Sequence, residues 1–391
     1  MTLNSIIEQH LGDNVPFSTY QAARGIAGAV EAHFRHHHEI SEIKDGYLRA
    51  PAPDAKVIET LLDTTFWASL RREEGYSPKI SIAFLPPNQA GEPLILGRHL
   101  PFTPHSLTKL APAVERSGIH LGVWRDGDNL YIWGTTRIIP SLCFVLEVIE
   151  PGVLVIKHRR GTGFGKFVNV AVLSGDQVKL IDERSSRLPD CPSLIHSLMG
   201  NQSPELWNDS MNTLVLLSAS MRAHGRGGIL LVLPVTNTDW KESIVHPITY
   251  PVEPSFSALA QLTDQQMPDH SDWQNSMSKA ISSLAGLTAV DGATIINEQY
   301  ELMAFGAKIA RGKGRPHIEE ILITEPIRGS SGRRVSSAQI GGTRHLSAAQ
   351  FVFDQKDAMA LVASQDGRFT IFSWSSCEEI VQAHRVDVLL M

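Results

Sequence analysis

The stretch that decides the fold is residues 288–296, TAVDGATII, taken together with residues 341–349, GGTRHLSAA. In the first segment an aspartate and a glycine precede apolar and β-branched residues, a pattern that predicts a turn leading into a buried strand. In the second segment two glycines precede an arginine, a histidine and two alanines, which predicts a loop leading into a short helix. Residues 360–367, ALVASQDG, predict a strand that ends in a turn.

Outward from these segments, helical and strand patterns alternate through the rest of the chain. Helices are predicted at residues 17–34, 54–74, 204–223, 273–287 and 347–351, and strands at residues 79–85, 94–97, 229–235, 293–296, 301–305 and 318–324. Hairpins are predicted at residues 120–133 and 359–372, and a polar insertion at residues 326–341. This order predicts an α/β (mixed α+β) fold, with a β-rich amino-terminal α/β domain and a carboxy-terminal domain whose mixed β-sheet is flanked by helices.

The length of 391 residues favours two domains, and prolines at positions 247, 251 and 254 suggest a boundary between them. We therefore predict domains at residues 1–250 and 251–391. With 42% hydrophobic and 19% charged residues, the composition is that of a globular protein. The net charge of −6 gives no general attraction to nucleic acid or to an anionic membrane, so neither is expected as a partner.

The compartment expected from the sequence is the cytoplasm. Residues 1–13 lack the basic segment and apolar core of a signal peptide, and the longest apolar runs are strand-sized. A membrane-spanning helix needs roughly 20 apolar residues. Three widely spaced cysteines fit a reducing compartment and provide no zinc or disulfide framework.

A histidine-rich run, HFRHHHE, occupies residues 33–39. Three adjacent histidines can suggest a metal site, but consecutive residues on a helix point in different directions. Structural zinc sites use spaced ligands. The sequence therefore favours a polar helix end at this run over a metal site.

Asp291 is the first candidate functional residue of the carboxy-terminal domain, because it lies between a predicted helix and a predicted buried strand. A carboxylate in such a connection can bind a divalent cation or accept a proton from a hydroxyl group. Gly292 and Ala293 would let a ligand approach the backbone closely. Taken alone, an Asp-Gly step is more often an ordinary turn.

A second candidate site follows the paired glycines, at Thr343, Arg344 and His345. Backbone amides at the start of a helix, a guanidinium group and an imidazole together suit a phosphate. Gly342 and Ser347 flank these residues and are included in this candidate phosphate site. The alternative for this segment alone is a capped helix with a surface arginine.

Taken together, these residues resemble the diadenylate cyclase (DAC) domain, whose two signatures are Asp-Gly-Ala and Arg-His-Arg. The first signature is intact at residues 291–293, and most of the second is present at residues 342–345. The resemblance extends over roughly residues 255–374. The amino-terminal part is similar to bacterial DAC-related proteins described as probable sensor-domain proteins, through the segments SLRREEG at residues 69–75 and HGRGG at residues 224–228.

The resemblance implies that ATP or a cyclic dinucleotide is the ligand and that Mg²⁺ or Mn²⁺ is the cofactor. In the cyclase family two domains face each other, each holding one ATP, which implies a homodimer through the DAC-like domain. It also implies that Asp291 is the catalytic residue and a metal ligand, with Asp366 as a second metal ligand. The residues from Thr343 to His345 would hold phosphates.

Two positions depart from the family pattern. Leu346 replaces the last arginine of the second signature, and Gln365 lies where active enzymes carry an acid. Each lost charged hydrogen bond to a phosphate removes about 1.5–3 kcal/mol. The sequence therefore favours a nucleotide-binding sensor with weak or absent cyclase activity in second-messenger signalling; the alternative is an active cyclase that makes cyclic di-AMP from two ATP molecules.

Overall fold

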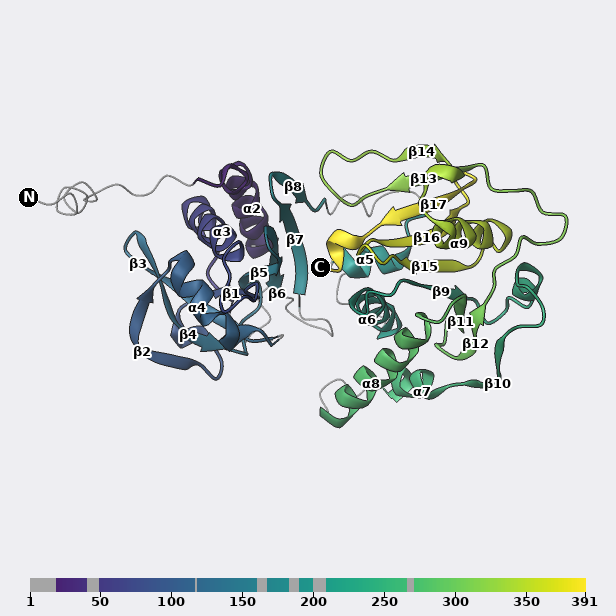
Figure 1. Ribbon diagram of the computed structural model, residues 1–391, viewed down its shortest axis with the longest axis horizontal. Coiled ribbons are helices and arrows are strands. Elements are labelled where there is room, and N and C mark those ends of the chain that lie inside the picture. The colour runs from purple at the N-terminus through teal and green to yellow at the C-terminus, as the bar shows by residue number, and fades with distance from the viewer. Residues whose placement is uncertain are drawn as a thin grey trace, which may run out of the picture. The chain divides into compact units, whose positions relative to one another are not determined.

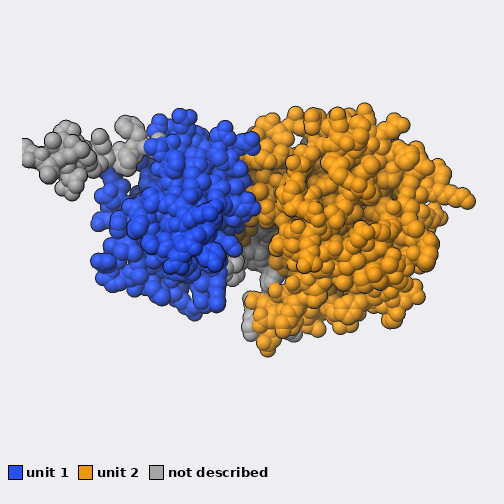
Figure 2. Space-filling model, in the orientation of Figure 1, with its two compact units in different colours: residues 1–161, 170–178 blue, residues 162–169, 179–391 orange. Residues whose placement is uncertain are grey.

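The computed structural model describes residues 19–40, 49–116, 118–159, 167–182, 190–199, 209–265 and 271–391 (Figure 1). The chain forms two compact units: unit 1 comprises residues 1–161 and 170–178, and unit 2 comprises residues 162–169 and 179–391 (Figure 2). Residues 1–13, from which the absence of a signal peptide was predicted, lie outside the described residues. The predicted mixed α/β fold class is confirmed, because both sheets contain parallel and antiparallel pairs and helices pack against them.

The first sheet has eight strands in the order β2-β4-β3-β1-β5-β6-β7-β8. β1 pairs in parallel with β3 and antiparallel with β5. β3 and β4 form the predicted hairpin, with Gly127 at φ +59° in its turn. The strands are β1 (Ser81–Phe84), β2 (Leu94–Pro101), β3 (His120–Asp126), β4 (Asn129–Thr136), β5 (Phe144–Glu150), β6 (Val153–Arg159), β7 (Phe167–Ser174) and β8 (Gln177–Leu180).

The described residues of unit 1 form the helices α2 (Gln21–Ile40), α3 (Ala55–Ser69) and α4 (Pro104–Val114). α3 starts where the Asp54 side chain accepts a hydrogen bond from the backbone N–H of Val57. Its apolar stripe of Ile58, Leu61 and Leu62 is fully buried, and the helix packs on β5 and β6. Burying each of these side chains contributes about 1.5–3 kcal/mol, so this stripe fixes α3 on the sheet.

The second sheet has nine strands in the order β10-β12-β11-β9-β15-β16-β17-β13-β14. β9 lies near its middle, parallel to β11 and antiparallel to β15. The strands are β9 (Gly228–Leu233), β10 (Tyr250–Phe256), β11 (Ala293–Asn297), β12 (Leu302–Ala307), β13 (Glu320–Thr324), β14 (Arg333–Ser336), β15 (Met359–Ala363), β16 (Phe369–Ser375) and β17 (Ile380–Arg385).

Helices cover both faces of the second sheet. α9 (Thr343–Asp354) packs on β9, β15, β16 and β17, and its Phe351 shares a core with Ala360 and Val362 of β15. Because side chains alternate along a strand, the fully buried Leu361 points to the other face, where α6 contacts β15. The remaining helices of this unit are α5 (Ser193–Met199), α6 (Asp209–Ala223), α7 (Ala258–Gln265) and α8 (Ser271–Leu287).

The division into units differs from the predicted domains 1–250 and 251–391. β9, assigned by that prediction to the amino-terminal domain, is hydrogen-bonded between β11 and β15 within the second sheet. Pro251 and Pro254, which suggested a linker, lie in β10 at the edge of the same sheet. Proline lacks an N–H group and is tolerated in edge strands as well as in linkers, so these prolines mark a sheet edge.

Two further elements of unit 2 differ from the sequence prediction. The segment 326–341 is not only a polar insertion, because it contains β14, which pairs antiparallel with β13. α9 begins at Thr343, earlier than the predicted helix at residues 347–351. The earlier start places Thr343 and Arg344 in the first turn of the helix, where backbone N–H groups lack intrahelical acceptors.

His384 of β17 should make the stability of unit 2 depend on pH. Its Nδ1 lies 2.7 Å from the Thr324 hydroxyl oxygen, and burial lowers its pKa to about 4. The unfolded chain, with a histidine pKa of about 6.5, binds the proton more readily. The stabilisation is therefore complete above about pH 6.5 and is lost as the pH falls towards about 4, by on the order of 3 kcal/mol.

Urea unfolding at about pH 7.5 and about pH 5 measures this loss. In His384→Gln, which cannot titrate, the difference in unfolding free energy between the two pH values should shrink. His317→Gln, at an exposed histidine of the same unit, is the matched control and should leave the difference unchanged. An equal pH dependence in wild type and His384→Gln would contradict the prediction.

Candidate functional site

A pocket of about 670 Å³ lies in unit 2 at one end of the central strands of the second sheet, where β9 and β11 begin and β15 ends. β9 and β11 run parallel and β15 runs antiparallel to β9, so the starts of β9 and β11 and the end of β15 lie side by side. The first turn of α9 also lines the pocket. Loop and strand-end residues from distant parts of the chain therefore converge here.

The residues predicted from the sequence to act or bind come from three separate segments, and the structure brings them together. All of them line this pocket: Asp291, Gly292, Ala293, Gly342, Thr343, Arg344, His345, Ser347 and Asp366. Their individual roles in catalysis, nucleotide binding and metal binding stay predictions.

Gly292 allows the backbone of two strands to meet at the pocket. Its φ is +117°, and a Cβ atom there would lie 2.4 Å from the carbonyl carbon of Gly306. No side chain fits at that distance. The glycine of the Asp-Gly-Ala signature is therefore required by the close approach of β11 and β12.

The amino terminus of α9 lines the pocket. Gly342 is its N-cap residue, and no side chain of the described residues caps the helix by a hydrogen bond. Arg344, in the first turn, is exposed and lies beside Gly227, where a Cβ atom would be 3.1 Å from Nη1 of the arginine. Uncapped N–H groups, the positive end of the helix dipole and a guanidinium group together favour an anion.

Lys308 is a pocket residue that the sequence analysis missed. It forms a short ion pair with Asp291, which holds the pKa of that carboxyl below its usual value, first through the hydrogen bond from Lys308 and then through its charge. The register explains the contact, because Ala293 pairs with Ala307 across the hairpin. The strand predicted at residues 301–305 ends before Lys308, so the sequence prediction does not bring this lysine to the pocket.

Asp366, the second predicted metal ligand, is also paired with a cation. Its carboxylate lies 3.3 Å from Nε of Arg368, and both side chains are more than half exposed. Carboxylate oxygens are the ligand type that Mg²⁺ and Mn²⁺ prefer, so Asp291 and Asp366 fit such a metal chemically. Within the described residues, however, these carboxylates join no group of three or more metal-ligating side chains.

His345 forms part of the pocket wall. It is 8% exposed, and burial, followed by the charge of Arg385, lowers its pKa. A neutral imidazole at this position can donate one hydrogen bond from one ring nitrogen and accept one at the other. His224 lies near the same edge of the sheet, with Nε2 3.2 Å from the Thr288 hydroxyl oxygen, but it is not a lining residue.

The two positions that depart from the DAC signatures have different environments. Leu346 is 40% exposed on α9 and is not among the residues that line the pocket. Gln365 lines the pocket, and its side-chain amide donates a hydrogen bond of 3.4 Å to the carbonyl of Arg226. The pocket thus has two cations, Lys308 and Arg344, against two carboxylates.

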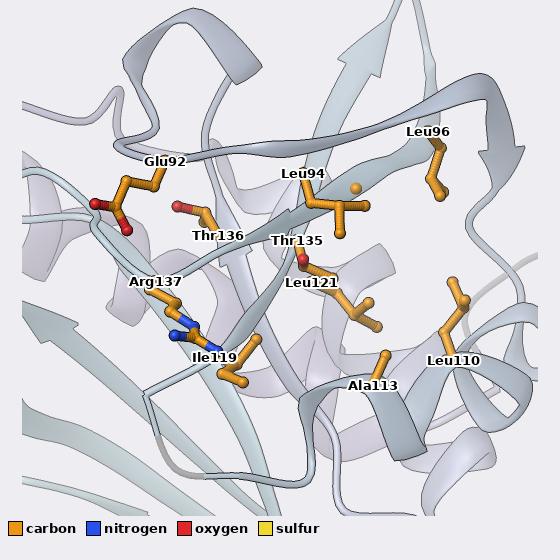
Figure 3. Close-up of a pocket in the computed structure, with 11 residues that line it drawn as sticks. Glu92, Leu94, Leu96, Leu110, Ala113, Ile119, Leu121, Thr135, Thr136 and Arg137 are labelled. Carbon is orange, nitrogen blue, oxygen red and sulfur yellow. The ribbon is translucent and has the colours of Figure 1, made fainter.

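Unit 1 contains a second pocket, of about 460 Å³, which the sequence analysis did not predict. Its wall is mainly aliphatic. In Figure 3 the side chains of Glu92 and Arg137 lie at one end and those of Leu96 and Leu110 at the other. Such a pocket suits a small apolar ligand that carries a polar group. Its residues lie in β2, α4, β3, β4 and the segments next to these strands, and no local motif marks them.

Comparison with known proteins gives information on unit 1. Residues 47–137 match the family described as "Probable sensor domain DACNV". The resemblance to probable sensor-domain proteins is therefore confirmed for this part of the chain, and the matched residues include all those that line the pocket of unit 1. No curated protein matches the chain.

Among solved structures, the chain is similar to one titled "The crystal structure of the hypothetical membrane spanning protein from Bacillus cereus". The two are 15% identical, and the match covers 49% of this chain and 70% of the other, with a TM-score of 0.28. In the part of this chain that the structure describes, no helix has the length and apolar character needed to cross a membrane.

The contact between Gly292 and Gly306 can be tested with Gly292→Ala. The added methyl group would meet the backbone of Gly306, and alanine is strained at φ +117°. We expect the unfolding free energy of unit 2 to fall by at least about 1–3 kcal/mol, as measured by urea unfolding.

Gly286→Ala is the matched control. Gly286 is exposed in α8, and no atom lies within 4 Å of a Cβ built there. Alanine favours helices over glycine by up to about 1 kcal/mol, so this variant should be as stable as wild type or more stable. Equal stabilities for the two alanine variants would show that the contact does not constrain the pocket.

Proposed function

We propose that unit 2 is a DAC-like nucleotide-binding domain and that unit 1 is its sensor domain, in a protein that acts in nucleotide second-messenger signalling. The observation that carries this proposal is the convergence of residues 291–293, 342–347 and 366 on one pocket. These segments are far apart in sequence, and the DAC resemblance implies that all of them take part in one nucleotide site. The match of residues 47–137 to a probable sensor domain supports the role of unit 1.

Phosphate groups are the part of a nucleotide that the pocket residues suit best. The uncapped first turn of α9 offers backbone N–H groups, and Arg344 and Lys308 offer positive charge. Charge-assisted hydrogen bonds from such donors are roughly twice as strong as neutral ones. ATP and a cyclic dinucleotide share this phosphate chemistry, and titration with each ligand distinguishes them.

The pairing of both carboxylates with cations favours nucleotide binding without efficient turnover. Asp291 has a lowered pKa and is held by Lys308, so it is a weak base for deprotonating a ribose hydroxyl. Asp291 is better suited to bind a metal ion than to accept a proton. A bound Mg²⁺ or Mn²⁺ would neutralise phosphate charge, with Asp291 and Asp366 as its protein ligands. Leu346 and Gln365 supply no charge where the DAC pattern has charged residues.

An active cyclase is the second candidate function. The pocket contains the intact Asp-Gly-Ala signature, and phosphoryl transfer depends mainly on positioning and charge neutralisation. By analogy with the DAC family, turnover would require two copies of unit 2 facing each other, and hence a homodimer. Lys308 would then have to release Asp291 when metal and nucleotide bind.

Arg344→Ala tests nucleotide binding. Loss of the guanidinium group removes a charged hydrogen bond to phosphate, so the dissociation constant for ATP or cyclic di-AMP should rise roughly tenfold to a hundredfold. Isothermal titration calorimetry in the presence of Mg²⁺ measures this change.

The matched control for this variant is Arg334→Ala. Arg334 is exposed on β14, pairs with Glu378 and does not line the pocket. Its removal should leave nucleotide affinity unchanged. Saturable binding to wild type that neither variant weakens would place the nucleotide site elsewhere, and absence of binding would contradict the proposal.

Asp291→Asn tests turnover. Purified protein is incubated with ATP and Mn²⁺, and products are separated by chromatography with mass detection. We expect wild type to form little or no cyclic di-AMP, because Asp291 is a weak base and two signature charges are missing. Substantial cyclic di-AMP that disappears in Asp291→Asn would instead support the active cyclase. Product that persists in Asp291→Asn would remove this residue from the reaction.

A further inference from the structure

Three histidines of unit 1 form a cluster away from both pockets. His33 and His37 lie on α2, and His158 lies near the end of β6. One ring nitrogen of each lies within 4.8 Å of a ring nitrogen of each of the others. Among the described residues, this is the group of three metal-ligating side chains that the fold brings together.

The geometry of the cluster follows from helix periodicity. His33 and His37 are four residues apart and share one face of α2, with ring centroids 4.3 Å apart. Both rings lie near His158, at centroid distances of 5.6 Å from His33 and 5.4 Å from His37. The imidazoles are tilted to one another by 38–46° and do not stack face to face.

The surroundings hold the rings in place. His158 is 6% exposed, and Phe34 packs against it and against Phe144. Nδ1 of His158 lies 3.3 Å from the carbonyl oxygen of Arg159, which favours a proton on Nδ1 and a lone pair on Nε2. A backbone carbonyl commonly orients a metal-binding histidine in this way.

The chemistry of the cluster selects a transition metal. All three ligands are imidazoles, which suit Zn²⁺ and its neighbours, whereas Mg²⁺ and Ca²⁺ prefer oxygen ligands. A tetrahedral zinc ion with Zn–N bonds of about 2.0–2.1 Å brings its ligand nitrogens to about 3.3 Å from one another. Small side-chain rotations of His33 and His37, which are only partly buried, can close the difference.

We propose that His33, His37 and His158 form a zinc-binding site, or a site for a related divalent transition metal, in the sensor unit. Three protein ligands leave at least one coordination position for water or a small ligand. The site lies outside the matched residues 47–137 but within unit 1. It ties α2 to β6 of the first sheet, so metal occupancy would stabilise this part of the unit.

The histidine run lies at the carboxy-terminal end of α2, as the sequence predicts, and the proposed ligands are not three adjacent histidines. Consecutive histidines 36–38 do not form the group. The ligands are His33 and His37, spaced by four, and a third histidine more than a hundred positions away. The proposal is independent of the proposed nucleotide site, because it rests on different residues in a different unit.

The test uses the full chain, purified without a polyhistidine tag and treated with chelator. Titration with Zn²⁺ by calorimetry should show one equivalent bound, and Co²⁺ should give the visible absorption bands of a four-coordinate site with three nitrogen ligands. His37→Ala should weaken Zn²⁺ binding at least about 100-fold and abolish the Co²⁺ bands. His37 is only partly buried, so replacing it should disturb the fold less than replacing the buried His158. His37→Ala is therefore the decisive variant.

His36→Ala is the matched control, because His36 is exposed on the same helix and is not in the group. It should retain wild-type Zn²⁺ affinity. Zinc should also raise the thermal unfolding temperature of wild type and His36→Ala but not that of His37→Ala. Absence of Zn²⁺ binding, or binding that His37→Ala leaves unchanged, would overturn the proposal.

Discussion

The candidate nucleotide site depends on the backbone contact between Gly292 and Gly306. A Cβ atom at residue 292 would lie 2.4 Å from the Gly306 carbonyl carbon, so the two strand ends can meet only if that position is glycine. The same contact brings Lys308 onto Asp291 and places both at the pocket edge. The Asp-Gly-Ala segment thus serves the strand geometry and the chemistry of the pocket at once.

The charges of the side chains that line the pocket indicate which kind of ligand it suits. Lys308 and Arg344 face Asp291 and Asp366, and the uncapped start of α9 adds backbone donors. An anion with an accompanying metal ion would satisfy both signs of charge. Because both carboxylates already have cationic partners, the proposed function is nucleotide binding rather than efficient turnover.

Unit 1 has two features that fit a sensor domain. One is the aliphatic pocket enclosed by the residues of the DACNV match, and the other is the histidine group between α2 and β6. They differ in chemistry, since the first suits a small apolar molecule and the second a transition metal. The histidine group links α2 to β6, which are distant in sequence, so metal binding there would stabilise both elements.

The sequence by itself determined the local elements and the residue types of the site. Runs of apolar and β-branched residues predicted the central strands, and the Asp-Gly and Gly-Gly steps predicted the turns at Asp291 and Thr343, because these signals act over a few residues. Only the tertiary structure decided that prolines 251 and 254 lie in an edge strand, that Lys308 neutralises Asp291, and that His158 joins His33 and His37. Those contacts depend on strand order and register, which local sequence patterns do not encode.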